Sequence, residues 1–147
     1  MDDYGRRITL DIPFDRAVHE ASKAFQAEGF DLVSTLDVRD YLARHAHHEC
    51  RRYVLLDALV PQFTLEALQH DAGIGPMLPS RIAVYELADG ETAVSVSPAL
   101  AAVADDFGWR AGRPEIAAIA DRASERVARA FARLHQIGVQ ARDQVPA

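Results

Sequence analysis

The first third of the chain predicts two strands, each followed by a helix. Residues 6–12 alternate apolar and polar side chains, as in a strand with one buried face. Residues 13–28 place apolar side chains three or four apart, beginning at a proline and ending before Gly29, which predicts a helix. Residues 30–36 return to a strand pattern, and Asp37 is predicted to be the N-cap of a shorter second helix.

The middle of the chain predicts a third strand, a helix and a hairpin. Residues 52–58 contain an apolar run, and Pro61 begins a helix that Gly73 is predicted to close, followed by a loop to Ser80. An Asp-Gly turn lies between the alternating runs 81–87 and 92–97, which is a strong hairpin signal. A helical turn is predicted at 100–105 and a loop at 106–113.

A long helix completes the predicted fold. From Pro114, apolar side chains recur three and four residues apart, and Gly138 is predicted to end the helix. The order β-α-β-(α)-β-α-β-β-α indicates an α+β domain, with a mostly antiparallel sheet of about five strands and the long helix on one face. We expect one domain over residues 1–138 and a frayed tail at 139–147.

Charge and composition exclude several classes of partner. The formal net charge is −6, which argues against binding to nucleic acid or to an anionic membrane. The apolar runs are too short to span a bilayer, and the N-terminus has no pattern of a secretory signal. Cys50 is the only cysteine and suits a reducing compartment, so we expect a cytoplasmic protein.

Several short motifs follow one another in a characteristic order. They are Glu28-Gly29-Phe30 after the first helix, Asp37-Val38 at the second, Tyr53-Val54-Leu55-Leu56 in the third strand, and Leu59-Val60-Pro61 and Leu78-Pro79-Ser80 around the next helix. Together with the closing helix from Pro114, this order resembles the bacterial domain-of-unknown-function 302 family. The resemblance implies a compact α+β fold of the TATA-binding-protein-like kind and a homodimer.

The chain departs from that family at its most typical positions. The family's two usual cysteines are replaced by Leu59 and Ser80, and its asparagine by Val60. Neither leucine nor serine can supply a thiolate, so any thiol chemistry of the family would be missing here. The resemblance implies no activity, because the family itself has no settled function.

The first functional prediction is a non-enzymatic domain that binds a small apolar or amphipathic ligand, or a protein partner. A curved antiparallel sheet under a long helix can leave an apolar cleft between them. The predicted lining consists of large apolar side chains, namely Phe63, Met77, Phe107, Trp109 and Phe131. For Trp109, a role as a cap over the core is the alternative. No cofactor is predicted.

The second prediction is a divalent-metal site in the segment from His45 to Cys50. Its His45, His47, His48, Glu49 and Cys50 side chains are the ligand types that zinc prefers. On a helix they would divide between two faces, and their spacing matches no zinc signature. An exposed polar helix end is the alternative. A hydrolase using Ser80 is a third hypothesis, although no base can be assigned to it from the sequence.

The closing helix also carries a line of basic side chains, formed by Arg122, Arg126, Arg129 and Arg133. Such a line can bind phosphate. Because Asp121 and Glu125 lie between these arginines, a solvated face with salt bridges is favoured instead.

Overall fold

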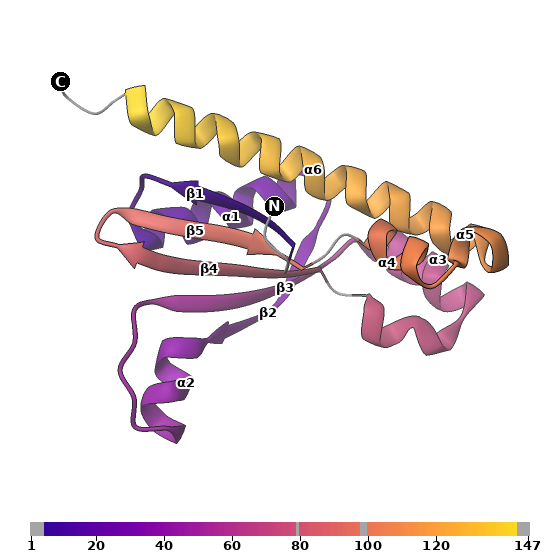
Figure 1. Cartoon of the computed structure of the whole chain (residues 1–147), viewed down its shortest axis with the longest axis horizontal. Helices are drawn as coiled ribbons and strands as arrows, with labels where there is room; N and C mark the ends of the chain where they lie inside the picture. The colour runs from indigo at the N-terminus through magenta and orange to yellow at the C-terminus, as the bar shows by residue number, and fades with distance from the viewer. Residues whose placement is uncertain (1–4, 79, 98–99, 144–147) are drawn as a thin grey trace.

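The fold is an antiparallel sheet covered on one face by two helices, seen in a computed structural model that describes residues 5–78, 80–97 and 100–143 (Figure 1). The sheet has five strands in the order β1-β5-β4-β3-β2. Their bounds are β1 Arg6–Leu10, β2 Asp31–Asp37, β3 Tyr53–Leu59, β4 Ser80–Ala88 and β5 Glu91–Val96. All four neighbouring pairs are antiparallel, which confirms the predicted fold class.

Helices α1 (Phe14–Ala27) and α6 (Pro114–Asp143) cover one face of this sheet. Helix α1 contacts β2, β4 and β5, whereas α6 lies along β1 and α1. Strand β3 shows why one face is buried: Val54, Leu56 and Ala58 point into the core, and the residues between them stay half exposed on the other side. The β4–β5 hairpin turns at Gly90, whose φ of 75° favours glycine, as the Asp-Gly signal predicts.

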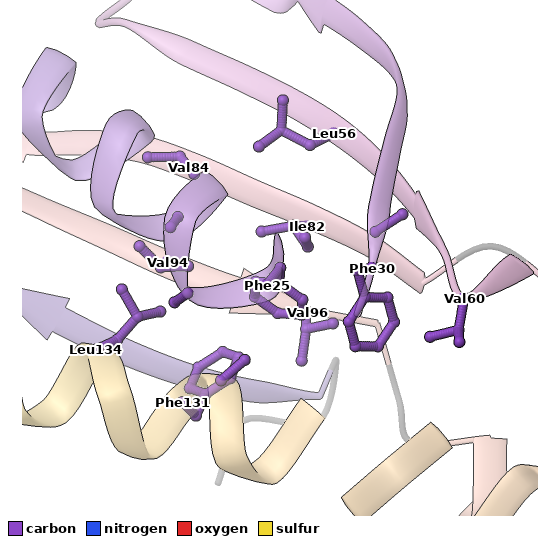
Figure 2. Close-up of a cluster of buried hydrophobic side chains, with 14 of the residues drawn as sticks. Phe25, Phe30, Leu56, Val60, Ile82, Val84, Val94, Val96, Phe131 and Leu134 are labelled. Atoms are coloured by element: carbon purple, nitrogen blue, oxygen red, sulfur yellow. The ribbon is translucent and has the colours of Figure 1, made fainter. Parts of the chain in front are cut away.

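The core is centred on three phenylalanine rings (Figure 2). Phe25 from α1 meets Phe30 edge to face at 5.3 Å between ring centroids, and meets Phe131 from α6 at 6.2 Å. Edge-to-face pairs add to the stabilisation that ring burial already provides. The rings therefore join α1, the start of β2 and α6 into one packed unit.

Four short helices gather at one end of the sheet, beside the first half of α6 (Figure 1). They are α3 (Pro61–His70), the 3-10 helix η1 (Ala72–Met77), α4 (Leu100–Asp106) and α5 (Trp109–Gly112). The predicted loops at 74–80 and 106–113 are thus partly helical. In η1 the Asp71 side chain accepts a hydrogen bond from the Gly73 N–H at 2.8 Å, which caps the short turn.

Helix α6 does not end at Gly138, which corrects the predicted helix boundary, and residues 139–143 of the predicted frayed tail are helical. The helix passes through Gly138 and continues to Asp143, and Ala141 is buried. Gly138 marks a close approach of the helix to the sheet: a Cβ atom there would lie 3.1 Å from Cδ2 of the buried Leu10 on β1, so the Leu10 side chain would have to shift by a few tenths of an ångström. The last four residues, 144–147, lie outside the described part of the chain.

Helix α2 (Val38–His45) lies beside β2 and β3, far from α6 (Figure 1). Its start confirms the predicted N-cap, because the Asp37 side chain accepts a hydrogen bond from the Asp40 N–H at 2.9 Å. Within the described residues, no helix combines the length and the apolar composition that a membrane crossing requires.

Candidate functional site

A small apolar cavity lies at the end of the sheet where the short helices meet α6. Its volume is about 30 Å³, which exceeds the space that one water molecule requires. Among the residues that the structure describes, every lining residue is apolar except Thr64 and Ser80. The lining consists of Phe30, Ala58, Val60, Phe63, Thr64, Ala67, Ile74, Leu78, Ser80, Ile116, Ile119 and Ala123.

Helical spacing explains why these side chains converge. Phe63 and Ala67 are four residues apart on α3 and therefore share a face, and Ile119 and Ala123 share a face of α6 in the same way. The two helices contact each other along these faces. Because two of the four facing residues are alanines, the packed helices leave space between them.

The floor of the cavity comes from the ends of two paired strands. Ala58 near the end of β3 pairs with Ser80 at the start of β4, and both line the cavity. The hydroxyl groups of Ser80 and Thr64 are the polar side-chain groups of this lining. A ligand in this cavity would therefore be held mainly through its apolar surface, with two hydroxyl groups able to give it an orientation.

Phe63 connects the cavity to the arginines of α6. Its side chain lines the cavity, and two guanidinium groups lie over its ring, with Arg122 Cζ at 4.9 Å and Arg126 Cζ at 5.2 Å from the centroid. Arg122 also donates a hydrogen bond to the Glu66 carboxylate at 2.6 Å, and this bond lowers the pKa of Glu66. Positive charge thus lies directly beside an apolar space.

Three arginines of the same line bind Glu28, which lies between α1 and β2. Arg126 donates to the backbone carbonyl oxygen of Glu28 at 2.9 Å, while Arg129 and Arg133 each donate to its buried carboxylate at 2.9 Å. These charged hydrogen bonds, first from Arg129 and then from Arg133, lower the pKa of Glu28. The arginines form salt bridges as predicted, but their partners are Glu28 and Glu66 on other elements, and the interleaved Asp121 pairs with Arg110 instead.

The structure does not bring the five predicted ligand-lining residues together. Phe63 lines the cavity, but Phe131 is in the core against Phe25, and Met77 packs against that core outside the cavity lining. Phe107 is 68% exposed and stacks on Trp109 at 5.9 Å. Trp109 packs against the small cluster of Ala104, Ala117 and Ala120. This contact agrees with the alternative prediction that Trp109 caps the core.

Sequence reasoning missed Ala67 and Ala123, the two small residues that leave the space. Their helical spacing marks them as facing inward, and it carries no information about unfilled volume. Ser80, the third hypothesis, does line the cavity, and no histidine is among the lining residues that the structure describes.

The histidine-rich segment does not form a helix beyond His45. Helix α2 ends there, and His47 has a left-handed φ of 50°, so the two helical faces predicted for the segment do not exist. His45, His47, His48 and Glu49 are exposed, and His45 lies 4.7 Å from the Tyr41 ring. Within the described chain, no three histidine, cysteine or acidic side chains lie close enough together to hold a metal ion.

The face of the sheet opposite α1 and α6 carries a second group of partly exposed side chains. Tyr53 and Tyr85 stack with their centroids 5.0 Å apart, and the Arg7 guanidinium lies 5.8 Å from the Tyr85 centroid. Leu55 lies beside them on β3, opposite Leu36 of the edge strand β2, which is 46% exposed. This tyrosine–leucine face is made of Leu36, Tyr53, Leu55 and Tyr85.

A polar pair borders the tyrosine–leucine face. The Asp57 carboxylate accepts a hydrogen bond from Arg81 Nε at 2.9 Å and one from the Ser34 hydroxyl at 2.8 Å. The Arg81 bond and then the Ser34 bond lower the pKa of Asp57. The two residues face each other across β3 and β4, so both charge signs occur at this border.

An open five-stranded antiparallel sheet with a long C-terminal helix across one face defines an α+β domain. The chain belongs to the family described as Domain of unknown function DUF302, whose model matches residues 6–134. The likeness extends to a solved structure, the uncharacterized conserved protein DUF302 from Bacillus stearothermophilus, with a TM-score of 0.74 and 18% identity over 90% of this chain and 98% of that one. No curated protein matches. At this identity, the solved structure shows the fold alone.

Proposed function

We propose that this protein is a non-enzymatic binding domain whose apolar cavity holds a small apolar ligand. The observation that carries the proposal is the lining itself, which is apolar apart from two hydroxyl groups. An apolar group that leaves water for such a space gains roughly 25 cal/mol for each Å² of its buried surface. The cavity is small, so the ligand places only a few carbon atoms inside it.

An NMR titration with 1-butanol tests this proposal. Isotope-labelled methyl groups of Ile116, Ile119 and Leu78 line the cavity and report its occupation. We expect their signals to shift and to saturate as 1-butanol is added. Shifts that stay linear, or that spread evenly over exposed methyl groups, would show that the cavity takes no ligand.

Two matched leucine variants of α6 complete the test. Ala123→Leu places extra volume in the cavity, whereas Ala132→Leu makes the same change on the exposed side of the helix. We expect Ala123→Leu to abolish the saturable shifts and Ala132→Leu to keep them. Equal binding by both variants would place the alcohol elsewhere on the protein.

We further propose that two copies of the chain associate through the tyrosine–leucine face. It is a partly exposed apolar surface on the side of the sheet opposite α1 and α6, and such patches with polar borders are typical of interfaces. The border carries both Asp57 and Arg81, so a second copy can present complementary charges to it.

The mass in solution, measured by light scattering, tests this association. We expect twice the mass of one chain for the native protein and a single-chain mass for Leu36→Lys, which puts a charge into the face. Leu65→Lys is the matched control, because Leu65 is 50% exposed and lies on α3, outside the face. A native protein with the mass of one chain would refute the association.

A further inference from the structure

We propose that the ligand of the apolar cavity carries a carboxylate or similar anionic group, and that Arg122 and Arg126 bind this group beside Phe63. The inference rests on the proposed binding function and adds the chemical class of the ligand to it. It defines an amphipathic ligand, with a short apolar part inside the cavity and a negative end at its wall.

The geometry of α6 places both parts of such a ligand within reach. Ile119 and Ala123 point into the cavity, and Arg122 and Arg126 each follow three residues later on the adjoining side of the helix. Both guanidinium groups lie over the ring of Phe63, about 5 Å from its centroid, and this ring is itself part of the cavity wall. A molecule that fills the cavity and extends past Phe63 therefore meets these groups first.

The hydrogen bonds of the two arginines leave capacity for an anion. Arg126 donates through one nitrogen to the carbonyl oxygen of Glu28, which is a neutral acceptor, and Arg122 donates through one nitrogen to Glu66. A guanidinium group carries five N–H donors, and its planar fork matches the two oxygens of a carboxylate. Neither bond uses up the donors of its arginine.

Local charge also favours an anion, although the whole chain has a net charge of −6. The carboxylate of Glu28 is engaged by Arg129 and Arg133, so it does not neutralise the two arginines on Phe63. Glu66 balances one of these two. Two other acidic residues lie on this stretch of α6, namely Glu125 and Asp121, and Asp121 is bound by Arg110. Apart from the Arg110–Asp121 pair, the four arginines of this line outnumber the three nearby glutamates, which favours an anion at this corner.

The competing classes are a neutral and a cationic ligand of the same size. A neutral ligand would gain nothing from the guanidinium groups, and an amine would be repelled by them while competing with Arg122 for Glu66. Titration with butyrate, 1-butanol and butylamine compares the three classes at nearly equal apolar volume. The methyl signals of Ile116 and Ile119 report binding in each case.

We expect butyrate to bind about tenfold more tightly than 1-butanol, because a charged hydrogen bond adds about 1.5 kcal/mol. In the double variant Arg122→Gln/Arg126→Gln, this advantage should fall below twofold, while binding of 1-butanol is retained. Arg16→Gln, on the exposed side of α1, removes one charge elsewhere and should keep most of the advantage. Arg126→Lys keeps the charge, so it should retain part of the advantage and serves as a second variant if the double variant does not fold.

The outcomes separate this inference from the proposed function. If 1-butanol binds and butyrate is no tighter, the anionic class is wrong and the apolar site stands. If the advantage of butyrate survives in the double variant, the two arginines are not the site of the anion. If neither molecule binds, both proposals are wrong.

Discussion

The carboxylate of Glu28 accepts one hydrogen bond from Nε of Arg129 and another from Nε of Arg133, each 2.9 Å long. The two arginines are one helical turn apart on α6, and Glu28 is the C-cap residue of α1. The contact therefore joins two helices that are about a hundred residues apart in the sequence. It lies next to the packed rings of Phe25 and Phe131, so ionic and apolar contacts hold the same junction.

The first prediction concerns the charge of Glu28. Glu28→Gln keeps the shape of the side chain but removes the charge that two arginines share, and it should lower the free energy of unfolding by about 2 kcal/mol. Urea denaturation followed by circular dichroism measures this. Glu20→Gln, on the same helix, is the control and should change stability by less than about 0.5 kcal/mol. Similar losses in both variants would mean that the shared charge contributes little.

The second prediction concerns the dependence of stability on pH. The pKa of Glu28 is lowered in the folded protein from its ordinary value of 4.5, so its contribution is present above pH 4.5 and is lost as the pH falls through the folded value. The difference in unfolding free energy between the native protein and Glu28→Gln should therefore be constant near pH 7 and narrow below pH 4.5. A difference that stays constant down to pH 3 would contradict the lowered pKa.

The third prediction concerns Gly29, which directly follows Glu28 in the chain. Its φ is 87°, and a Cβ atom would lie 2.6 Å from Nη1 of Arg126. Gly90 has a similar φ of 75°, with open space around it. Gly90→Ala should cost about 1 kcal/mol for the left-handed backbone alone, and Gly29→Ala should cost more. Thermal denaturation of both variants gives the difference, which should shrink in an Arg126→Ala background. Equal costs would mean that Arg126 moves away freely.

The fourth prediction concerns the close approach of α6 to β1. Gly138→Val should destabilise the protein by about 1–3 kcal/mol, because the added atoms press on the buried Leu10. In a Leu10→Ala background the cost should be smaller, and a double-mutant cycle measures this coupling. A cost that is the same in both backgrounds would place its origin in the helix itself and not in the contact.

The elements that could be predicted are those whose periodicity reflects burial on one face. The alternation in β1, the Asp-Gly turn and the apolar stripe of α6 all follow from one-sided packing. The prediction that α6 ends at Gly138 was wrong, because glycine can either end a helix or allow another element to approach it closely. Only the position of Leu10 shows that the second role applies here. The same limit applies to the cavity, which arises from how side chains of distant elements fill space.

The roles of the arginines were only partly predictable. Their spacing on α6 and the interleaved acids indicated salt bridges, and such bridges exist. The partners Glu28 and Glu66 lie on other helices, at sequence distances that no local rule connects. The helical interpretation of the histidine-rich segment was wrong, because α2 ends at His45 and does not continue through the segment.

The pairing of β1 with β5 has a consequence for the order in which the molecule folds. β1 is made before its partner strand, which begins at Glu91. Beside this pair, the side-chain hydroxyl of Thr92 donates a hydrogen bond to the carbonyl oxygen of Ile12 at 2.9 Å. On the ribosome, the first strand must therefore wait for more than half of the chain, and the local β4–β5 hairpin can form before it joins. Closing so long a loop is slow. Until β5 has been made, the backbone N–H and C=O groups of β1 lack the strand that pairs with them in the folded sheet.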